Sequence, residues 1–224
     1  MSADPGGTTV FSQGVAVNYL STTMLSLLNI FTSTSFTPSF YAKITGSPNI
    51  AAGTYTDTLT VHWVWSICTG VNIAGACVGG SANGTKDIMV AVSLSVGQDC
   101  RISAPDVSFG SAPLVGQFST VNQAVLVDCS KGSHYKVAFT SGNGGSARPW
   151  RTMSDGAGHS LQYNIYQPNG TTIWDETNPL PSATAGTGST IPSQPQAYIV
   201  RINSGQITPP AGHYSDMVSV VISF

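Results

Sequence analysis

The sequence is poor in charge. Lysine, arginine, aspartate and glutamate make up only 8% of its 224 residues, against roughly 25% in an ordinary soluble domain. Intrinsic disorder needs high charge and few apolar residues, so the 41% hydrophobic content excludes it. The net charge of −2 is not that of a protein that binds nucleic acid or an anionic membrane. Such a composition fits an extracellular protein that packs against copies or relatives of itself, and equally a low-charge secreted domain.

Metal-binding and catalytic patterns are also missing. The four cysteines form no CxxC pair, and the four histidines lack the spacing of zinc ligands, so we expect no metal and no cofactor. His213, Ser215 and Asp216 superficially suggest a catalytic triad. Neighbouring residues of a strand alternate between its faces, however, so these side chains cannot converge as nucleophile and base. We therefore expect that the protein is not an enzyme.

Membrane-spanning and targeting segments are absent as well. No uninterrupted apolar run is long enough to cross a membrane. The first basic side chain is Lys43, so the sequence does not start with the basic region of a secretory signal. Cysteines without metal spacing nevertheless favour two disulfides, which form in oxidising compartments. We expect an exported protein whose signal peptide is missing or removed.

The stretch 87–100 organises the rest of the chain. Its apolar residues fall on every second position, which predicts a β-strand with one apolar face. These residues are Ile88, Val90, Val92, Leu94 and Val96. The stretch lies between two copies of another strand, GTYTDTLTVHWVW from Gly53 and GHYSDMVSVVISF from Gly212. The offset between the copies is constant, 212 − 53 = 159 residues.

This repeat predicts two tandem domains, residues 1–97 and 98–224, with strand 88–96 closing the first. The second domain opens near Cys100, so the first copy should open near 100 − 159 = −59. We therefore expect the first domain to be truncated at its N-terminus. Within it, residues 40–44 are expected to form a strand, and residues 1–13 to be loose.

The second half consists of short alternating patterns separated by Gly, Pro and Asn turns. These patterns predict strands over 121–129, 135–139, 161–165, 198–202 and 218–224. Such a series without a convincing helix predicts an antiparallel β-sandwich. Cys100 and Cys129 fall on apolar strand faces, and a disulfide between them would contribute about 3–4 kcal/mol. Cys68 and Cys77 form the second expected pair.

Five separated motifs then carry a family resemblance. They are CRIS from Cys100, AVLVDC up to Cys129, RTM from Arg151, LQYNIY over 161–166 and PAGHYSD over 210–216. In this order they resemble the spore coat protein U domain, the pilin domain of archaic chaperone–usher pili. The resemblance covers 88–224, while over 14–65 only the family's last strands match. Two such domains in tandem are similar to the tip adhesin of these pili. The fold that this implies is a pair of immunoglobulin-like antiparallel sandwiches.

The resemblance also implies partners. Each pilin domain of the family lacks its last strand, which a periplasmic chaperone supplies first and the next pilin subunit supplies later by donor-strand exchange. The strand that would accept the donor carries Val218, Val220, Ile222 and Phe224. The implied route is secretion through the periplasm and the usher to the bacterial cell surface. The implied function is that of a tip adhesin in attachment and biofilm formation. A minor shaft pilin and a structural coat protein of spores or envelopes are the alternatives.

Topology predicts where adhesion would occur. Successive strands of an antiparallel sandwich reverse direction, so loop 68–86 and segment 22–36 should meet at the pole away from the second domain. Apolar side chains on them would form a tip for hydrophobic surfaces. These candidates are Leu25, Leu27, Leu28, Ile30, Phe31, Val71 and Ile73. The alternative is that 24–31 packs into the core of the first domain.

Overall fold

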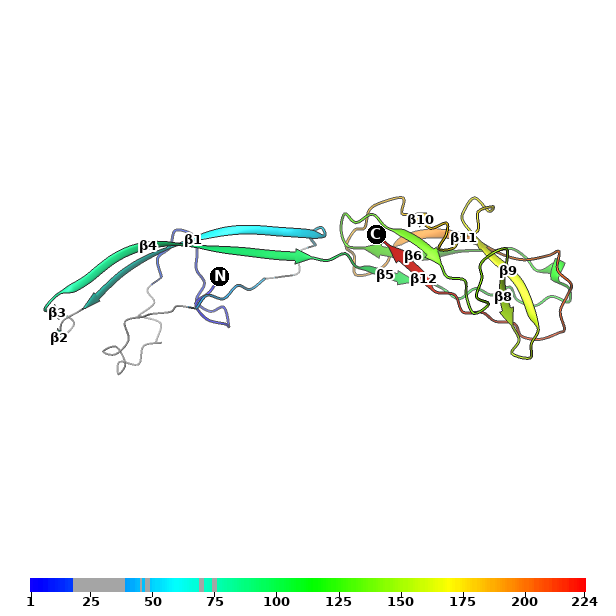
Figure 1. Cartoon of the computed structure of the whole chain (residues 1–224), viewed down its shortest axis with the longest axis horizontal. Helices are drawn as coiled ribbons and strands as arrows, with labels where there is room; N and C mark the ends of the chain where they lie inside the picture. Colours follow the sequence, from blue (N-terminus) through cyan, green and yellow to red (C-terminus); the bar gives the residue numbers. More distant parts are fainter. Residues whose placement is uncertain (18–38, 45, 47–48, 69–70, 74–75) are drawn as a thin grey trace. The chain divides into compact units, whose positions relative to one another are not determined.

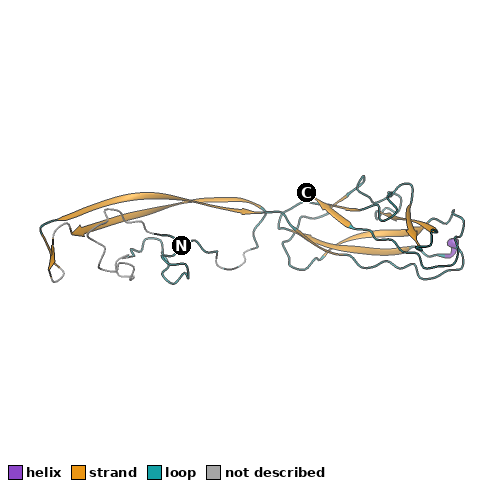
Figure 2. Cartoon of the chain, turned by 60° about the horizontal axis from the view of Figure 1, so that its bottom comes forward, coloured by secondary structure: helices purple, strands orange, loops and turns teal. Residues whose placement is uncertain are grey.

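The computed structural model describes residues 1–17, 39–44, 46, 49–68, 71–73 and 76–224. Strands provide nearly all of the regular structure, and the described residues contain one short helical turn, Val115–Gln117 (Figure 2). All pairings between the described strands are antiparallel. The all-β fold with antiparallel sheets is therefore confirmed. The chain divides into two compact units, Met1–Pro48 and Asn49–Phe224, and the predicted domain boundary after residue 97 stays a prediction.

The first unit is held by backbone bonds between Ser2 and Tyr41, whose N–H groups donate to each other's carbonyls over 2.9 and 3.0 Å. The carboxylate of Asp4 accepts backbone N–H bonds from Thr8 and the next residue, which lower its pKa to about 2. The start of the chain is thus a closed turn rather than a loose segment. The expected strand 40–44 is wrong, since only Tyr41 forms a bridge. The turn at Asp4 leads the chain away after Ser2, so the ladder cannot continue.

Two long strands form what we call the ribbon (Figure 1). They are β1, Gly53–Cys68, and β4, Ser81–Val96, and they pair along their whole length from Gly53 opposite Val96 to Cys68 opposite Ser81. Beyond them β2, Val71–Ile73, pairs with β3, Ala76–Val78. The expected strand 88–96 is the second half of β4. Its polar first half joins the ladder through the backbone, which the side-chain pattern does not reveal.

Two sheets form the sandwich that follows. The larger has the order β5-β6-β11-β9-β8 and the smaller the order β10-β7-β12 (Figure 1). The strands of the larger sheet are Cys100–Ser103, Val121–Cys129, Gln194–Ile202, Ser160–Tyr166 and Arg151–Ser154. Those of the smaller sheet are Leu180–Pro181, Lys136–Phe139 and Val220–Ser223. The predicted central strands are confirmed, whereas the C-terminal strand is shorter than expected, Val220–Ser223 instead of 218–224.

The core between these sheets consists of side chains at alternating strand positions. Val125, Val127 and Val137 are fully buried, and so is Trp174 from the loop between β9 and β10. The indole of Trp174 meets the ring of Phe139 edge to face, with centroids 4.9 Å apart, and its Nε1–H donates to the carbonyl of Val137. Each buried aliphatic side chain contributes roughly 1.5–3 kcal/mol, so this core is what holds the two sheets together.

Candidate functional site

Strand β12 lies at an edge of the smaller sheet. It pairs with β7 on one side, with Val220 opposite Phe139 and Ile222 opposite Val137. Just before β12, Ser215 forms a bridge with β8 of the larger sheet. Among the described residues, no segment pairs with the other side of β12. The chain from residue 215 to 223 therefore has one occupied and one free edge.

The side chains of this segment that face the core are only half buried. Val218, Val220 and Ile222 pack against the core cluster. Their partners across the ladder, Val137 and Phe139, are 0% and 5% exposed. Both sets lie on the same face of the sheet, because directly opposite residues of a ladder share a face. The apolar row of β12 thus lacks cover on its free side.

The backbone of the same residues points to the free edge. Ser219 is bound to Thr140 in both directions, since its carbonyl accepts the Thr140 N–H over 2.9 Å and its N–H donates to Oγ1 of Thr140 over 3.0 Å. The N–H and C=O groups of successive residues in a strand point to opposite sides. Val218, Val220 and Ile222 therefore turn both groups away from β7. A strand laid beside β12 would find a hydrogen-bonding edge and an apolar row together.

The larger sheet also has an open edge, at β5. Ile102 pairs with Val127 and shares its inner face, yet Ile102 is 41% exposed while Val127 is fully buried. The ring of Phe109, from the segment after β5, lies 6.5 Å from that of Tyr163, centroid to centroid. The hydroxyl of Tyr163 in turn donates to Asp216, ahead of β12. Both open ends therefore adjoin the same part of the core, and the sandwich is incomplete there.

Asp216 fixes the start of the free edge. It accepts the Tyr163 hydroxyl over 2.6 Å and the backbone N–H of Asn143 over 2.7 Å. Burial, and then this bond to a carboxylate, raise the pKa of Tyr163. The phenol therefore stays protonated and keeps donating. Sequence reasoning placed Asp216 in the repeat, in the PAGHYSD motif and in an apparent triad, and in the structure it is a hydrogen-bond acceptor that holds the start of the edge.

Arg151 is a second anchor, and it is completely buried. Its guanidinium donates to the carbonyls of Phe139, Thr140 and Trp174 over 2.9 to 3.2 Å, and to Oδ1 of Asn164. The carbonyls of Phe139 and Thr140 lie where the chain leaves β7, and that of Trp174 lies in the loop between β9 and β10. Burial lowers the pKa of Arg151. The arginine of the RTM motif thus supplies hydrogen bonds to the carbonyls at the end of β7, the strand with which β12 pairs.

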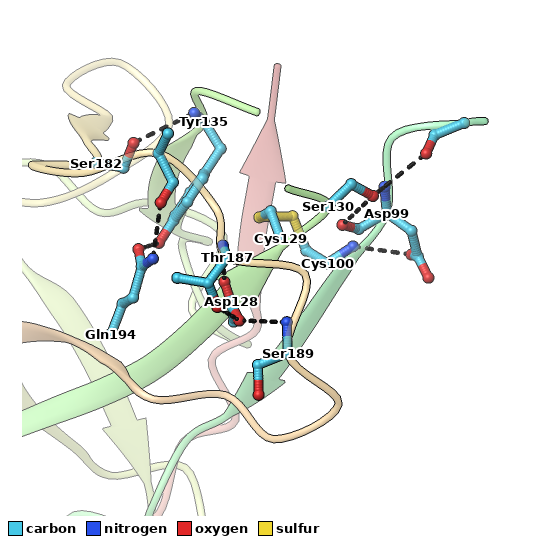
Figure 3. Close-up of a disulfide and its surroundings, with 12 residues drawn as sticks. Asp99, Cys100, Asp128, Cys129, Ser130, Tyr135, Ser182, Thr187, Ser189 and Gln194 are labelled. Atoms are coloured by element: carbon cyan, nitrogen blue, oxygen red, sulfur yellow. Dashed lines mark hydrogen bonds between the residues drawn. A yellow bond between two sulfur atoms is a disulfide. The ribbon is translucent and has the colours of Figure 1, made fainter. Parts of the chain in front are cut away.

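The disulfide lies at the start of β5 (Figure 3). Cys100 and Cys129 lie directly opposite each other in β5 and β6 and are bonded, as the sequence indicates. Next to them, Oγ of Ser130 accepts the N–H of Asp99 over 2.9 Å and donates to the carbonyl of Gly97. The short link between β4 and β5 is therefore tied to the sandwich at the residue after Cys129.

Asp128 lies near the disulfide, next to Cys129 in β6 (Figure 3). It is 1% exposed and accepts the backbone N–H groups of Thr187 and Ser189 over 2.7 and 2.8 Å. Burial acts to raise the pKa of Asp128, but these bonds and the Thr187 hydroxyl outweigh it and hold the pKa below its ordinary value. The loop around residue 188 is thereby fixed to β6. Sequence reasoning missed Asp128, although its place just before Cys129 in a buried strand was a signal.

The predicted site residues meet different outcomes. The predicted closing residues lie on one face of β4, with Ile88 opposite Val61 and Val90 opposite Leu59 in β1. The tip candidates Leu25, Leu27, Leu28, Ile30 and Phe31 lie outside the described residues, as do the side chains of Val71, Ile73, Cys68 and Cys77. Phe224, the last predicted accepting residue, is 56% exposed.

No three histidine, cysteine, aspartate or glutamate side chains gather in the described part of the chain as a metal site requires. No helix in this part of the chain is long and apolar enough to cross a membrane.

These features define an all-β protein with a sandwich that is open along one strand edge. Comparison with known families identifies it further. A model of the Spore Coat Protein U domain matches residues 2–62 and 87–221, and the chain belongs to this family. The match leaves out residues 63–86, the outer part of the ribbon.

Solved structures give more distant matches. One is a chaperone–tip adhesion subunit pre-assembly complex, CsuC–CsuE, from archaic chaperone–usher Csu pili of Acinetobacter baumannii. It is 24% identical with a TM-score of 0.47, covering 78% of this chain and 60% of that one. Another is a chaperone–tip adhesin complex of CFA/I fimbriae biogenesis, 11% identical with a TM-score of 0.39, covering 77% of this chain and 53% of that one. The chain thus spans less than two thirds of each. No curated protein matches it.

Proposed function

We propose that the chain is a subunit of a chaperone–usher pilus, and that its C-terminal sandwich is completed by a strand from another protein. The observation that carries this proposal is the free edge of β12. Three apolar side chains there face the core without full cover, and their backbone groups point outward. Pairing of an added strand with such an edge is an established mode of peptide recognition.

The internal repeat supports the proposal. Strand β1 is the first copy of the sequence that forms β12, and β1 is paired along its length by β4. Leu59 and Val61 of β1 correspond to Val218 and Val220, and they have Val90 and Ile88 opposite them. Each copy of the strand is therefore paired on one side, β1 by β4 and β12 by β7, and no described segment pairs with the second edge of β12. An apolar, uncharged open edge is prone to aggregate, so the second copy needs a partner.

The partners follow from this need. A periplasmic chaperone would cover the edge first, and an adjacent pilin subunit would then occupy it by donor-strand exchange during assembly at the usher. The mature location is the pilus on the bacterial cell surface, reached through the periplasm. The strand 88–96 would close the first domain in cis, so that the chain accepts one donor through residues 218–224.

Adhesion is the finer part of the proposal. Because β1 and β4 are antiparallel, the turn of the ribbon lies at the opposite end from Val96. Near that turn Val64 is 68% exposed, Val78 55% and Trp65 39%. Clustered exposed apolar side chains usually mark an interaction site. We assign this end, which the family match leaves out, to attachment to hydrophobic surfaces and to biofilm formation.

The test is co-expression of the full chain with its periplasmic chaperone. The proposal requires that the gene for this chaperone lie in a cluster beside the gene for the chain. We expect a soluble one-to-one complex with the chaperone and aggregated chain without it. Val220→Asp with Ile222→Asp should abolish the complex, because both carboxylates would enter the apolar row. Ser219→Asp with Ser223→Asp, on the other face of the strand, should leave it intact. A soluble, stable monomer that ignores the chaperone would refute the proposal, and so would the lack of such a gene cluster.

A further inference from the structure

The dipeptide Asn-Gly occurs three times in the chain, as Asn83-Gly84, Asn143-Gly144 and Asn169-Gly170. At such a dipeptide the backbone nitrogen of the glycine can attack the side-chain carbonyl of the asparagine, because glycine has no Cβ to hinder the approach. The reaction needs a free backbone nitrogen, a free side-chain amide and a backbone that can rotate to bring the two together. Only one of the three dipeptides meets these conditions.

The dipeptide at Asn169 is held by hydrogen bonds on both reacting groups. Oδ1 of Asn169 accepts the backbone N–H groups of Thr171 and Thr172 over 3.0 Å each, and its Nδ2 donates to Oγ1 of Thr172 over 2.9 Å. The N–H of Gly170 donates to the carbonyl of Gln167 over 2.8 Å. These bonds must open before the nitrogen can reach the side chain.

The dipeptide at Asn83 is held by the ribbon. Asn83 and Gly84 lie inside β4, opposite Ser66 and Trp65 of β1. The indole of Trp65 lies against Gly84, so that a Cβ there would collide with the ring. Rotation of this backbone would break the ladder and displace the indole.

The dipeptide at Asn143 is open. It lies in a turn that the Gly145 N–H closes by donating to the carbonyl of Gly142 over 3.4 Å. Within the described part of the chain, neither the Asn143 amide side chain nor the Gly144 N–H makes a hydrogen bond. Both residues are exposed, and they line an open hollow of about 280 Å³ that gives water access to them.

We propose that Asn143 is a site of spontaneous deamidation, and that the reaction acts on the clamp at the start of the free edge. The nitrogen of Gly144 loses its proton to water and bonds to Cγ of Asn143, and the side-chain nitrogen leaves as ammonia. Water then opens the five-membered imide at either of its carbonyls. Residue 143 becomes aspartate, or isoaspartate when the main chain runs through the former side chain. The reaction requires no partner except water and does not depend on what occupies the edge.

The turn at Asn143 is part of the clamp because it holds Asp216. The backbone N–H of Asn143 donates to Oδ1 of Asp216 over 2.7 Å, and Tyr163 donates to Oδ2. Gly142 lies so close to this carboxylate that a Cβ there would collide with it. A carboxylate formed at position 143 therefore repels that of Asp216, and an isoaspartate also lengthens the turn. Either product loosens the residue that fixes the start of β12.

Peptide mapping by mass spectrometry tests the site. The purified full chain, with its chaperone when the chain needs one, is kept in warm, mildly alkaline heavy-oxygen water and sampled over time. We expect conversion of Asn143 with uptake of one heavy oxygen, and conversion of Asn83 and Asn169 at least about 10-fold more slowly, since hydrogen bonds must open first. In urea-unfolded chain the three should react at similar rates. Folded chain in which Asn143 does not convert, or converts no faster than the other two, overturns the proposal.

The effect on the clamp needs a separate measurement. Asn143→Asp, which carries the charge of the product, should unfold at a lower urea concentration than Asn143→Gln, which stays neutral. The difference should vanish when both are combined with Asp216→Asn, because the repelled carboxylate is then absent. If Asp216→Asn does not fold, added salt replaces it and should narrow the difference by screening the repulsion. Equal midpoints for Asn143→Asp and Asn143→Gln, or a difference that neither change reduces, overturn the effect on the clamp.

Discussion

Replacing Arg151 by methionine should destabilise the sandwich more than any exposed charge could. The substitution keeps an unbranched side chain of similar length but removes the donors to three backbone carbonyls and to Oδ1 of Asn164. Each buried acceptor left without a partner costs roughly 1–3 kcal/mol. Part of this is regained because the buried cation is no longer desolvated. We expect a net loss of about 3–5 kcal/mol, a large part of the stability of an ordinary domain.

The assay is urea unfolding of the chain purified in its chaperone complex, followed by circular dichroism and compared between parent and variant in the same complex. A loss of this size should lower the midpoint by about 2 M, at the slope usual for small domains. Arg101→Met is the matched control, because Arg101 is exposed on β5 and should not shift the midpoint. If Arg151→Met unfolded at the same urea concentration as the parent chain, the hydrogen bonds from the guanidinium to the carbonyls at the end of β7 would not stabilise the fold.

Three other perturbations follow from the structure. Reducing the bond between Cys100 and Cys129 should remove about 3–4 kcal/mol, and mass spectrometry of unreduced peptides should find the two residues linked rather than as free thiols. Because the folded-state pKa of Asp128 is lowered, its carboxylate stabilises the fold above about pH 4 and this contribution is lost as the pH falls through that lower pKa. Asp128→Asn should therefore reduce stability at pH 7 and flatten the dependence of stability on acid pH. A urea midpoint equal to that of the parent chain at both neutral and acid pH would contradict this. Val64→Ser with Val78→Ser should lower the attachment of piliated cells to polystyrene severalfold, and undiminished attachment with normal piliation would exclude the ribbon end as the adhesive site.

The strands that sequence reasoning identified are those whose side chains alternate. Strands β6, β9 and β11 turn apolar side chains toward the core at alternating positions, and the half of β4 from Ile88 onward shows the same alternation. The half of β4 before Asp87 is polar and joins a ladder only through its backbone. A ladder of this kind depends on the position of its partner, which no local pattern encodes.

The residues that anchor the free edge were beyond prediction for a related reason. Trp174 stands with Ile173 in a loop of otherwise polar, glycine and proline residues, and no alternating pattern signals that it is fully buried. Arg151 was noticed only as part of a motif, because an arginine in a sequence is normally expected at the surface. Both are buried by elements distant in sequence. The accepting residues Val218, Val220 and Ile222 could be named, since alternation and the repeat both mark them.

The backbone alternation along β12 gives this strand a distinctive pattern of amide hydrogen exchange. The N–H groups of Val221 and Ser223 face β7 and should exchange slowly, whereas those of Val220 and Ile222 face the free edge and should exchange fast. Fast and slow amides therefore alternate residue by residue within one strand. An arriving partner strand would slow only the fast set. Occupancy of the edge can thus be followed at two amides inside the protein, whichever molecule supplies the strand.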